Sequence, residues 1–408
     1  GLVLADNRAQ TLAISVAVAR GAQRLHEQAR FIEVLEQSGR LDRALEGLPE
    51  RKALTARLAA GQGLTKPELA VLLAYSRMNY FESIVASDIA DDPFVQDVLA
   101  GYFPPQLLER FAAGIRDHRL RREIVATAIA VAIVNQVGPG VGFRIREEVG
   151  VGIDDVARAY LVASRVFGTD AVWSQVEALE GRVPSALQTE LFTVTAEFIE
   201  RGMSAVLRGY KDCLVPSRLV ERLHQGVHTL WEAMPRPLAG RHRSEFERRV
   251  RRYTRAGVPL DLARSLAAMP PMTAALDVVD VAQSARADVI AAAWIHSDLS
   301  AHLELDWVRR QIDTLAVQSH WHLQARAGLR ADADRHLRDL TAAVLAQQIR
   351  ERSPRGRLEH WLHDNQAALE RYRQRLAEFK AGGSFDYAIL SLVLAGVGDL
   401  VRRRVDVD

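Results

Sequence analysis

Glycines crowd one stretch of the chain, VGPGVGFRIREEVGVG (137–152), where they could cradle a phosphate group. A dinucleotide fingerprint needs the spacing G-x-G-x-x-G between a strand and a helix, because its backbone must approach the pyrophosphate closely. Glycines alternate from Gly138, but Phe143 stands where the third glycine should be, and an apolar helical pattern precedes them. The stretch therefore predicts a helix end at Gly138, a turn around Pro139 and a new helix from about residue 142.

Two acids and a histidine could hold a metal ion. Asp298, His302 and Asp306 are spaced four apart, so on one helix they would share a face. No glutamate or third imidazole completes the set. The alternative is a solvated helix end with a break near Leu303-Glu304, and we expect no metal site.

The remaining histidines and the cysteine give weaker patterns. His320 and His322 diverge on a helix, whereas His360 and His363 could share a face, and we expect structural roles for all four. Cys213 is the only cysteine, which excludes a disulfide within the chain and favours a reducing, cytoplasmic compartment. No histidine lies near it in sequence, so we expect a small, buried or half-buried residue rather than a nucleophile.

Arginines concentrate in RHRSEFERRVRRYTR (241–255), which could grip phosphates. Read as a helix, this stretch keeps a narrow apolar stripe of Phe246, Val250 and Tyr253. The formal net charge of the whole chain is only +2, and no nucleic-acid motif accompanies the arginines. The pattern favours a solvated face or a contact in an oligomer, and we do not expect nucleic acid as a partner.

The sequence predicts that helices position all of these residues. The 408 residues are 48% hydrophobic and 25% charged, as in a globular protein, and apolar residues recur at three- and four-residue steps. Thr65-Lys66-Pro67-Glu68 has the spacing of a capping box. We expect an all-α fold of roughly 15 to 20 helices, without a parallel sheet or a solenoid repeat. IVATAIAVAIV (124–134) is about half the length of a membrane span and predicts a buried helix.

The sequence marks the domain boundaries only weakly. Gly209-to-Pro216 and MPRPLAGRH (234–242) are the best linker candidates, and proline breaks at Asp92-Pro93 and Phe103-Pro104-Pro105 predict short helices. We predict two packed helical subdomains, 62–210 and 211–408, preceded by N-terminal helices in 1–61. Two long helices, 358–380 and 384–404, should close the chain, joined by Gly382-Gly383.

Several stretches resemble one family, the very large bacterial NAD-specific glutamate dehydrogenases, in the region after their catalytic domain. The resemblance spans essentially the whole chain and is most specific in its first half. The stretches that carry it are LADNRAQTLAISVA (4–17), LTKPELAVLLAYSRMNYFESIVASDIADDPFVQDVLAGYFPPQLLERF (64–111), HRLRREIVATAIAVAIVNQVGPGVGFRIREEVG (118–150), DDVARAYLVASRVF (154–167), PLDLARSLAAMPPMTAALDVVDVA (259–282) and LELDWVRRQID (303–313).

The resemblance implies a parent enzyme that oxidatively deaminates L-glutamate to 2-oxoglutarate and ammonia and reduces NAD. The family's catalytic and nucleotide-binding residues lie upstream and have no matching positions here. We therefore assign no catalytic, cofactor-binding or metal residue, and expect NAD to bind the parent enzyme but not this segment. No signal peptide is recognised, and the chain opens with Gly1 rather than methionine, which is consistent with a piece of a longer protein.

The resemblance leaves three possible roles for an all-helical region. The first is structural: the opening helices, 4–37, pack on the catalytic domain of the same chain and support assembly of a homo-oligomer. The second is an effector-binding regulatory module, with an amino acid in a cleft between the two halves. The third is a helical nucleic-acid adaptor that uses Arg241–Arg255.

Overall fold

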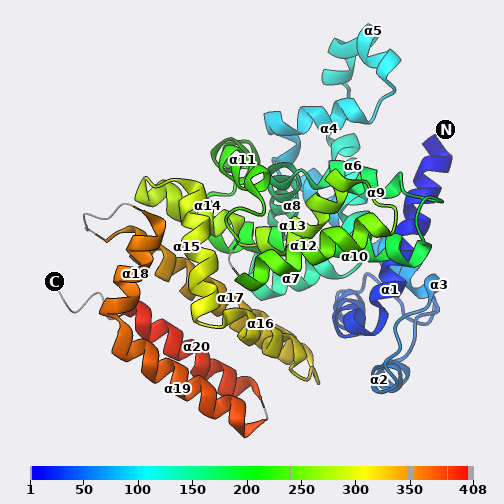
Figure 1. Ribbon diagram of the computed structural model, residues 1–408. Coiled ribbons are helices and arrows are strands. Elements are labelled where there is room, and N and C mark those ends of the chain that lie inside the picture. Colours follow the sequence, from blue (N-terminus) through cyan, green and yellow to red (C-terminus); the bar gives the residue numbers. More distant parts are fainter. Residues whose placement is uncertain (1, 239, 348–352, 384, 403–408) are drawn as a thin grey trace. The chain divides into compact units, whose positions relative to one another are not determined.

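The computed structural model describes residues 2–238, 240–347, 353–383 and 385–402. These residues form twenty α-helices and three short 3-10 helices, with no strand among them (Figure 1). The predicted all-α class is confirmed. The chain divides into two compact units, unit 1 (Gly1–His224 with Ala256–Val258) and unit 2 (Gln225–Arg255 with Pro259–Asp408).

Unit 1 contains the first ten α-helices and the three short 3-10 helices. Their bounds are α1 (Leu2–Gln37), α2 (Arg51–Ala59), α3 (Lys66–Ala86), η1 (Ile89–Asp91), η2 (Pro93–Val95), α4 (Gln96–Gly101), α5 (Pro105–Arg116), α6 (Arg121–Val137), α7 (Val141–Val149), α8 (Ile153–Phe167), α9 (Thr169–Glu177), α10 (Ser185–Tyr210) and η3 (Lys211–Cys213). In α11 (Pro216–Ala233) the chain passes from unit 1 to unit 2. The predicted limit at residue 210 precedes this helix, and the three predicted domains stay predictions.

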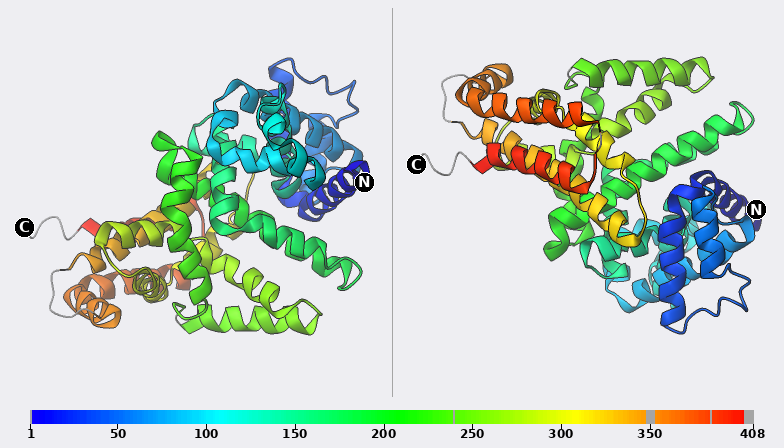
Figure 2. Two further views of the ribbon diagram at one scale, coloured as in Figure 1. Left: turned by 90° about the horizontal axis from the view of Figure 1, so that it is seen from above. Right: turned by 90° about the horizontal axis from the view of Figure 1, so that it is seen from below.

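Unit 2 is built around one long helix, α17, which packs against α14, α15, α16 and α20. The bounds of its helices are α12 (Gly240–Arg255), α13 (Leu260–Met272), α14 (Ala275–Ala285), α15 (Val289–His302), α16 (Leu305–Thr314), α17 (His320–Leu345), α18 (Pro354–Asp364), α19 (Gln366–Gly382) and α20 (Tyr387–Arg402). Helices α19 and α20 lie side by side in Figures 1 and 2.

Local sequence signals set several helix ends as predicted. The Thr65 N–H donates to Glu68 Oε2 at 2.7 Å, which closes the capping box at the start of α3. Helix α6 ends at Val137, and Gly138 follows with a φ of 93°, a conformation that favours glycine. The stretch 124–134 lies within α6, whose core-facing side chains are buried as predicted. Between the two proline breaks lies the short helix α4.

The predicted long helix 358–380 is wrong, because the chain breaks at Asn365. Helix α18 ends at Asp364, and Asn365 Nδ2 donates to the Trp361 carbonyl oxygen at 2.9 Å. Asparagine side chains bond to nearby backbone in this way and so compete with helix continuation. Helix α19 then runs to Gly382, while residues 384, 403 and 404 of the predicted last helix lie outside the described residues.

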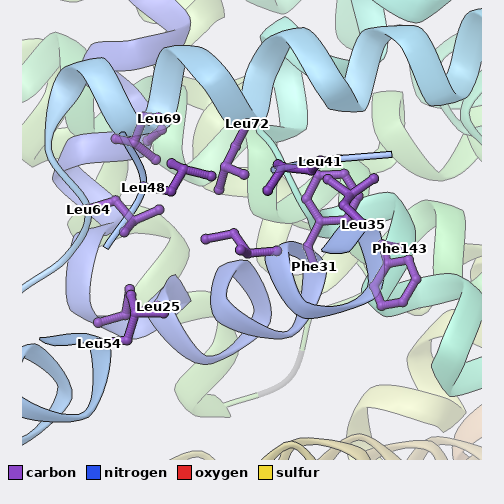
Figure 3. Close-up of a cluster of buried hydrophobic side chains, with 12 residues drawn as sticks. Leu25, Phe31, Leu35, Leu41, Leu48, Leu54, Leu64, Leu69, Leu72 and Phe143 are labelled. Carbon is purple, nitrogen blue, oxygen red and sulfur yellow. The ribbon is translucent and has the colours of Figure 1, made fainter. Parts of the chain in front are cut away.

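The core of unit 1 contains a leucine-rich cluster formed by α1, α3 and α7 and the segments between them (Figure 3). Phe31 of α1 and Phe143 of α7 stack at one end with ring centroids 5.7 Å apart. Leu25 and Leu72 are fully buried in the same cluster. Because α7 packs on α1 here, the polar residues that follow Phe143 are brought against α1 as well.

Candidate functional site

The glycine-rich turn between α6 and α7 allows helices to approach closely. A Cβ atom added to Gly142 would lie 1.7 Å from the Tyr80 hydroxyl oxygen of α3, and one added to Gly140 would lie 3.8 Å from the Glu27 carbonyl oxygen of α1. Burial raises the pKa of Tyr80 well above its ordinary value. These contacts give the glycines a packing role, and the predicted helix end and turn are confirmed.

This turn sets α7 beside a buried cluster of opposite charges, which we call the Arg–Glu cluster. Its six members come from three helices and are Arg20, Arg24 and Glu27 of α1, Arg144 and Glu148 of α7, and Glu200 of α10. The three positive and three negative side chains balance. Segments 180 residues apart in sequence are therefore joined by ion pairs.

Glu200 is the shared acceptor of the Arg–Glu cluster. Its carboxylate accepts from Arg24 at 2.7 Å and from Arg144 at 3.1 Å, and it also pairs with Arg20. Its side chain is only 6% exposed. Charge-assisted bonds of this kind are stronger than neutral ones, and a buried carboxylate needs them because water cannot solvate it.

Glu27 and Glu148 complete the cluster around Arg144. Arg144 Nε donates to Glu27 Oε2 at 2.9 Å, and Arg144 Nη1 donates to Glu148 Oε1 at 2.7 Å. Burial alone would lower the pKa of Arg144, but Glu148, Glu27 and Glu200 together raise it. The same balance of burial against Glu200 and Glu27 raises the pKa of Arg24. Both guanidinium groups therefore stay charged, which suits an electrostatic clamp and not proton transfer.

A small pocket borders the cluster, between α1 and the end of α6. Three buried atoms of its lining residues have no hydrogen-bond partner among the described residues: Arg20 Nε, Glu27 Oε1 and Gln28 Oε1. The free volume of ≈ 10 Å³ admits about one water molecule. Ligand pockets are typically about 300–1,000 Å³, so this one supports neither a nucleotide nor an amino acid.

The acids and histidine proposed as metal ligands are divided between two helices. His302 Nδ1 lies 2.9 Å from the Asp298 carbonyl oxygen within α15, which ends before Leu303 and Glu304, as the alternative predicted. Asp306 begins the next helix and accepts instead from His242 Nε2 at 2.5 Å. Within the described ranges, no group of three or more histidine, cysteine or acidic side chains is placed to hold a metal ion.

His320, His322 and His360, which the sequence analysis also considered, each contact another side chain. The His320 ring lies 4.3 Å from that of Trp321, and the His322 ring lies 5.2 Å from that of Tyr387. His360 Nε2 lies 3.3 Å from Asp364 Oδ2, one helical turn away. These contacts support structural roles.

Cys213 is exposed, so the expectation of a buried or half-buried residue is wrong. It ends the short helix η3 between α10 and α11, whose three residues are all on the surface. The residue type alone predicted burial of Cys213. Its exposure depends instead on the path of the connection between α10 and α11 over the surface.

The arginine-rich stretch forms α12 and has the predicted apolar stripe. Phe246 and Tyr253 are buried, and the helix packs against α13. Its exposed side carries ion pairs within the helix, including Arg241 to Glu245 at 2.9 Å and Arg243 to Glu247 at 3.7 Å. Glutamates thus neutralise part of the basic face, which supports the interpretation of this stretch as a solvated helix face.

A polar network around Arg309 in unit 2 escaped the sequence analysis. Arg309 donates to Asp334 at 2.8 Å and to Asp306 at 3.4 Å, and so joins α16 to α17. Nearby, His296 Nδ1 lies 3.2 Å from Thr341 Oγ1, which itself donates to the Leu337 carbonyl oxygen at 2.8 Å. Since that hydroxyl proton is used, His296 must donate from Nδ1. Only the Asp306–Arg309 spacing could have been read from sequence.

The Arg–Glu cluster was missed too, although α1 held a signal. Arg20, before the break in α1 at Gly21, and Arg24 and Glu27, after it, follow each other at four and three residues among buried apolar side chains such as Val16 and Phe31. Charges on a core-facing stripe indicate buried partners. The identity of the partner Glu200 could not be read from the pattern.

Among the helices described, none is by itself long and apolar enough to cross a membrane. Arg121–Val137 and Val141–Val149 reach that length and apolarity only as a pair, which is bent by 92°.

With this helical architecture in view, comparison with known proteins shows the class. Residues 61–399 match the family model described as the C-terminal part of glutamate dehydrogenase, and the chain belongs to this family. The resemblance inferred from the sequence is confirmed.

The chain is also similar to proteins named NAD-specific glutamate dehydrogenase. It is 33% identical to that of Pseudomonas aeruginosa, 32% to that of Halomonas elongata and 31% to that of Mycobacterium tuberculosis. Each match covers 98% of this chain but 25% of the relative. The chain thus spans about a quarter of the length of these relatives.

Proposed function

We propose that this chain is the non-catalytic, C-terminal helical region of an NAD-specific glutamate dehydrogenase. The parent enzyme converts L-glutamate, NAD and water to 2-oxoglutarate, ammonia and NADH. The family match and the names of the relatives support this assignment, and the quarter coverage supports a catalytic part elsewhere in the polypeptide. NAD binds that other part and not this region.

The observation that carries the non-catalytic role is the way charged side chains are used in unit 1. In the Arg–Glu cluster each carboxylate faces an arginine, so the groups brace α1, α7 and α10 against one another. The pocket beside them admits about one water molecule. Such a region acts by holding shape, and its role is to support the catalytic domain and its assembly.

Helix α1 is part of this support. The prediction that residues 4–37 pack on the catalytic domain stays a proposal, with one refinement from the structure. From residue 8 onward the apolar side of α1 is buried in its own unit, including Phe31 and Ile32. Val18, on its outer side, is 39% exposed and available to another domain. Homo-oligomeric assembly, which the resemblance implies, and a cytoplasmic location, which the single cysteine favours, belong to the same proposal.

Activity and binding measurements on two proteins test this function. The full-length parent enzyme should form NADH from NAD only when L-glutamate is present. The absorbance of NADH measures this reaction. The 408-residue chain alone should form none and should release no heat with NAD in titration calorimetry. Micromolar NAD binding by the chain alone would overturn the non-catalytic assignment, and a parent enzyme without glutamate-dependent NADH formation would overturn the reaction.

A further inference from the structure

Helix α5 has an apolar face that its own unit leaves uncovered. The helix is kinked at Phe111, where φ is −129° and ψ is 27°; Leu107 and Leu108 lie in the part before this kink and Ile115 in the part after it. Ile115 is buried and Leu108 is half-buried, but Leu107 is 41% exposed and Phe111 is 51% exposed. Large apolar side chains gathered on one exposed face mark an interaction surface.

The surroundings of α5 extend this surface. The helix packs against α4 and projects with it at the edge of unit 1 (Figure 1). Tyr102, before α5, and Leu120, after it, are 50% and 52% exposed. The Phe103 ring lies 5.7 Å from that of Tyr102 and 5.9 Å from that of His118, so the segments at the two ends of α5 meet.

A helix of this kind needs a partner. Isolated helices shorter than about 12–15 residues are marginal in water, and helices in proteins are held by packing of their apolar face. Helix α5 spans 12 residues with a kink at Phe111, and Leu107 and Phe111 are exposed. Removing this apolar surface from water would stabilise both the helix and the contact.

We propose that the apolar face of α5 is the docking surface for the part of the parent dehydrogenase that lies outside these 408 residues. The inference rests on the proposed function. The chain spans about a quarter of its relatives' length, so most of the polypeptide is available to cover a face that unit 1 leaves open. Exposed charges of both signs border these side chains, among them Glu109, Arg110 and Asp117. The partner surface is therefore an apolar patch with a mixed polar rim.

Hydrogen exchange in two proteins tests the docking. Backbone amides of residues 105–116 should exchange at least about tenfold more slowly in the full-length parent enzyme than in the 408-residue chain, at equal temperature and pH. Equal exchange in the two proteins would overturn the inference. Protection in the parent that vanishes on dilution to the monomer would assign the face to a second copy, which would also overturn it.

Two substitutions on one helix sharpen the test. Phe111→Asp should remove the protection in the parent and leave the melting temperature of the 408-residue chain unchanged, because the side chain is exposed there. Ala113→Asp, at an exposed residue of α5 without a large apolar side chain, should keep the protection. Equal effects of the two substitutions in the parent would argue against an apolar contact.

NADH formation from L-glutamate, measured on the same wild-type parent preparation, separates this inference from the proposed function. If the parent is inactive, the proposed function fails. If the parent is active but α5 is unprotected, the docking inference alone fails.

Discussion

The two units bury charge in different ways. In unit 1 the Arg–Glu cluster matches three guanidinium groups with three carboxylates, and the pKa values of Arg24 and Arg144 are raised, so the charged forms are favoured. In unit 2 a buried histidine and a partly exposed aspartate are held towards neutrality. Burial raises the pKa of Asp277 to about 7, and burial lowers the pKa of His296 to about 3.

The difference lies in the neighbours of each buried group. Asp277 has other acids near it, Asp334 and Asp280, while its nearest cation, Arg338, is 4.0 Å away. Near His296, Arg309 lowers the pKa while Asp334 and Asp306 raise it, and burial has the largest effect. Its Nδ1 contacts a neutral hydroxyl, that of Thr341. Burial therefore leaves a charge in place where opposite charges bond to the group directly, and neutralises it where they do not. The arginines of the Arg–Glu cluster should stay charged as the pH changes, whereas Asp277 and His296 should make the stability of unit 2 depend on pH.

Removing the shared acceptor of the Arg–Glu cluster should have the largest effect. Glu200→Gln leaves three buried arginines short of a counter-charge, and breaking a buried ion pair in this way costs about 3–5 kcal/mol. Urea unfolding should show this loss. Glu147→Gln, which removes a half-exposed pair with Arg30, should lose under about 1 kcal/mol. Equal losses would show that burial does not distinguish the two pairs.

Acid should destabilise unit 2 through His296. Its folded pKa of about 3 lies below the ordinary value of 6.5, so the unfolded chain binds the proton more readily between these pH values. The free energy of unfolding should fall by about 2 kcal/mol from this group as the pH drops from 6.5 to 5, and should continue to fall towards pH 3. Calorimetric melting of His296→Gln should show a smaller fall.

The exposed His360 provides the control for that measurement. His360→Gln should melt with the same pH dependence as the wild type, since its side chain is 46% exposed. A pH dependence that persists unchanged in His296→Gln would refute the assignment to His296.

Asp277 should act in the opposite direction. Its folded pKa of about 7 lies above the ordinary value of 3.8, so it lowers stability as the pH rises from 3.8 to 7, and the full penalty remains above pH 7. Asp277→Asn should therefore raise the melting temperature at pH 8, with a gain of about 1 kcal/mol because the side chain is partly solvated, and the gain should disappear near pH 4. Asp332→Asn, at a more exposed acid, should give no such gain; a lower melting temperature for Asp277→Asn at pH 8 would contradict the raised pKa.

The exposed face of α12 should show the smallest effect. Glu247→Gln removes the counter-charge of Arg243 and Arg251, both at 3.7 Å within the helix. Exposed pairs of this type contribute about 0.3–0.5 kcal/mol each, so the total loss in urea unfolding should stay below about 1 kcal/mol. A loss as large as that of Glu200→Gln would show that this face is buried in solution.

The sequence by itself determined the helical class, the family and several helix ends. The capping box at Thr65 and the helix end at Gly138 depend on hydrogen bonds and φ angles within a few residues, so their signals are local. Tertiary structure alone decided which buried charges meet. Arg20 and Glu200 are 180 residues apart, and nothing in the spacing of either helix names its partner.

The same distinction explains the wrong predictions. Asn365 interrupts a pattern that is helical on both sides, and Cys213 is exposed although its residue type favours burial. The pairing of Asp306 with His242 depends on how α12 and α16 pack, and not on the four-residue spacing from His302. Local propensity sets where helices form, but packing between distant helices decides which side chains are buried and which charges are neutralised.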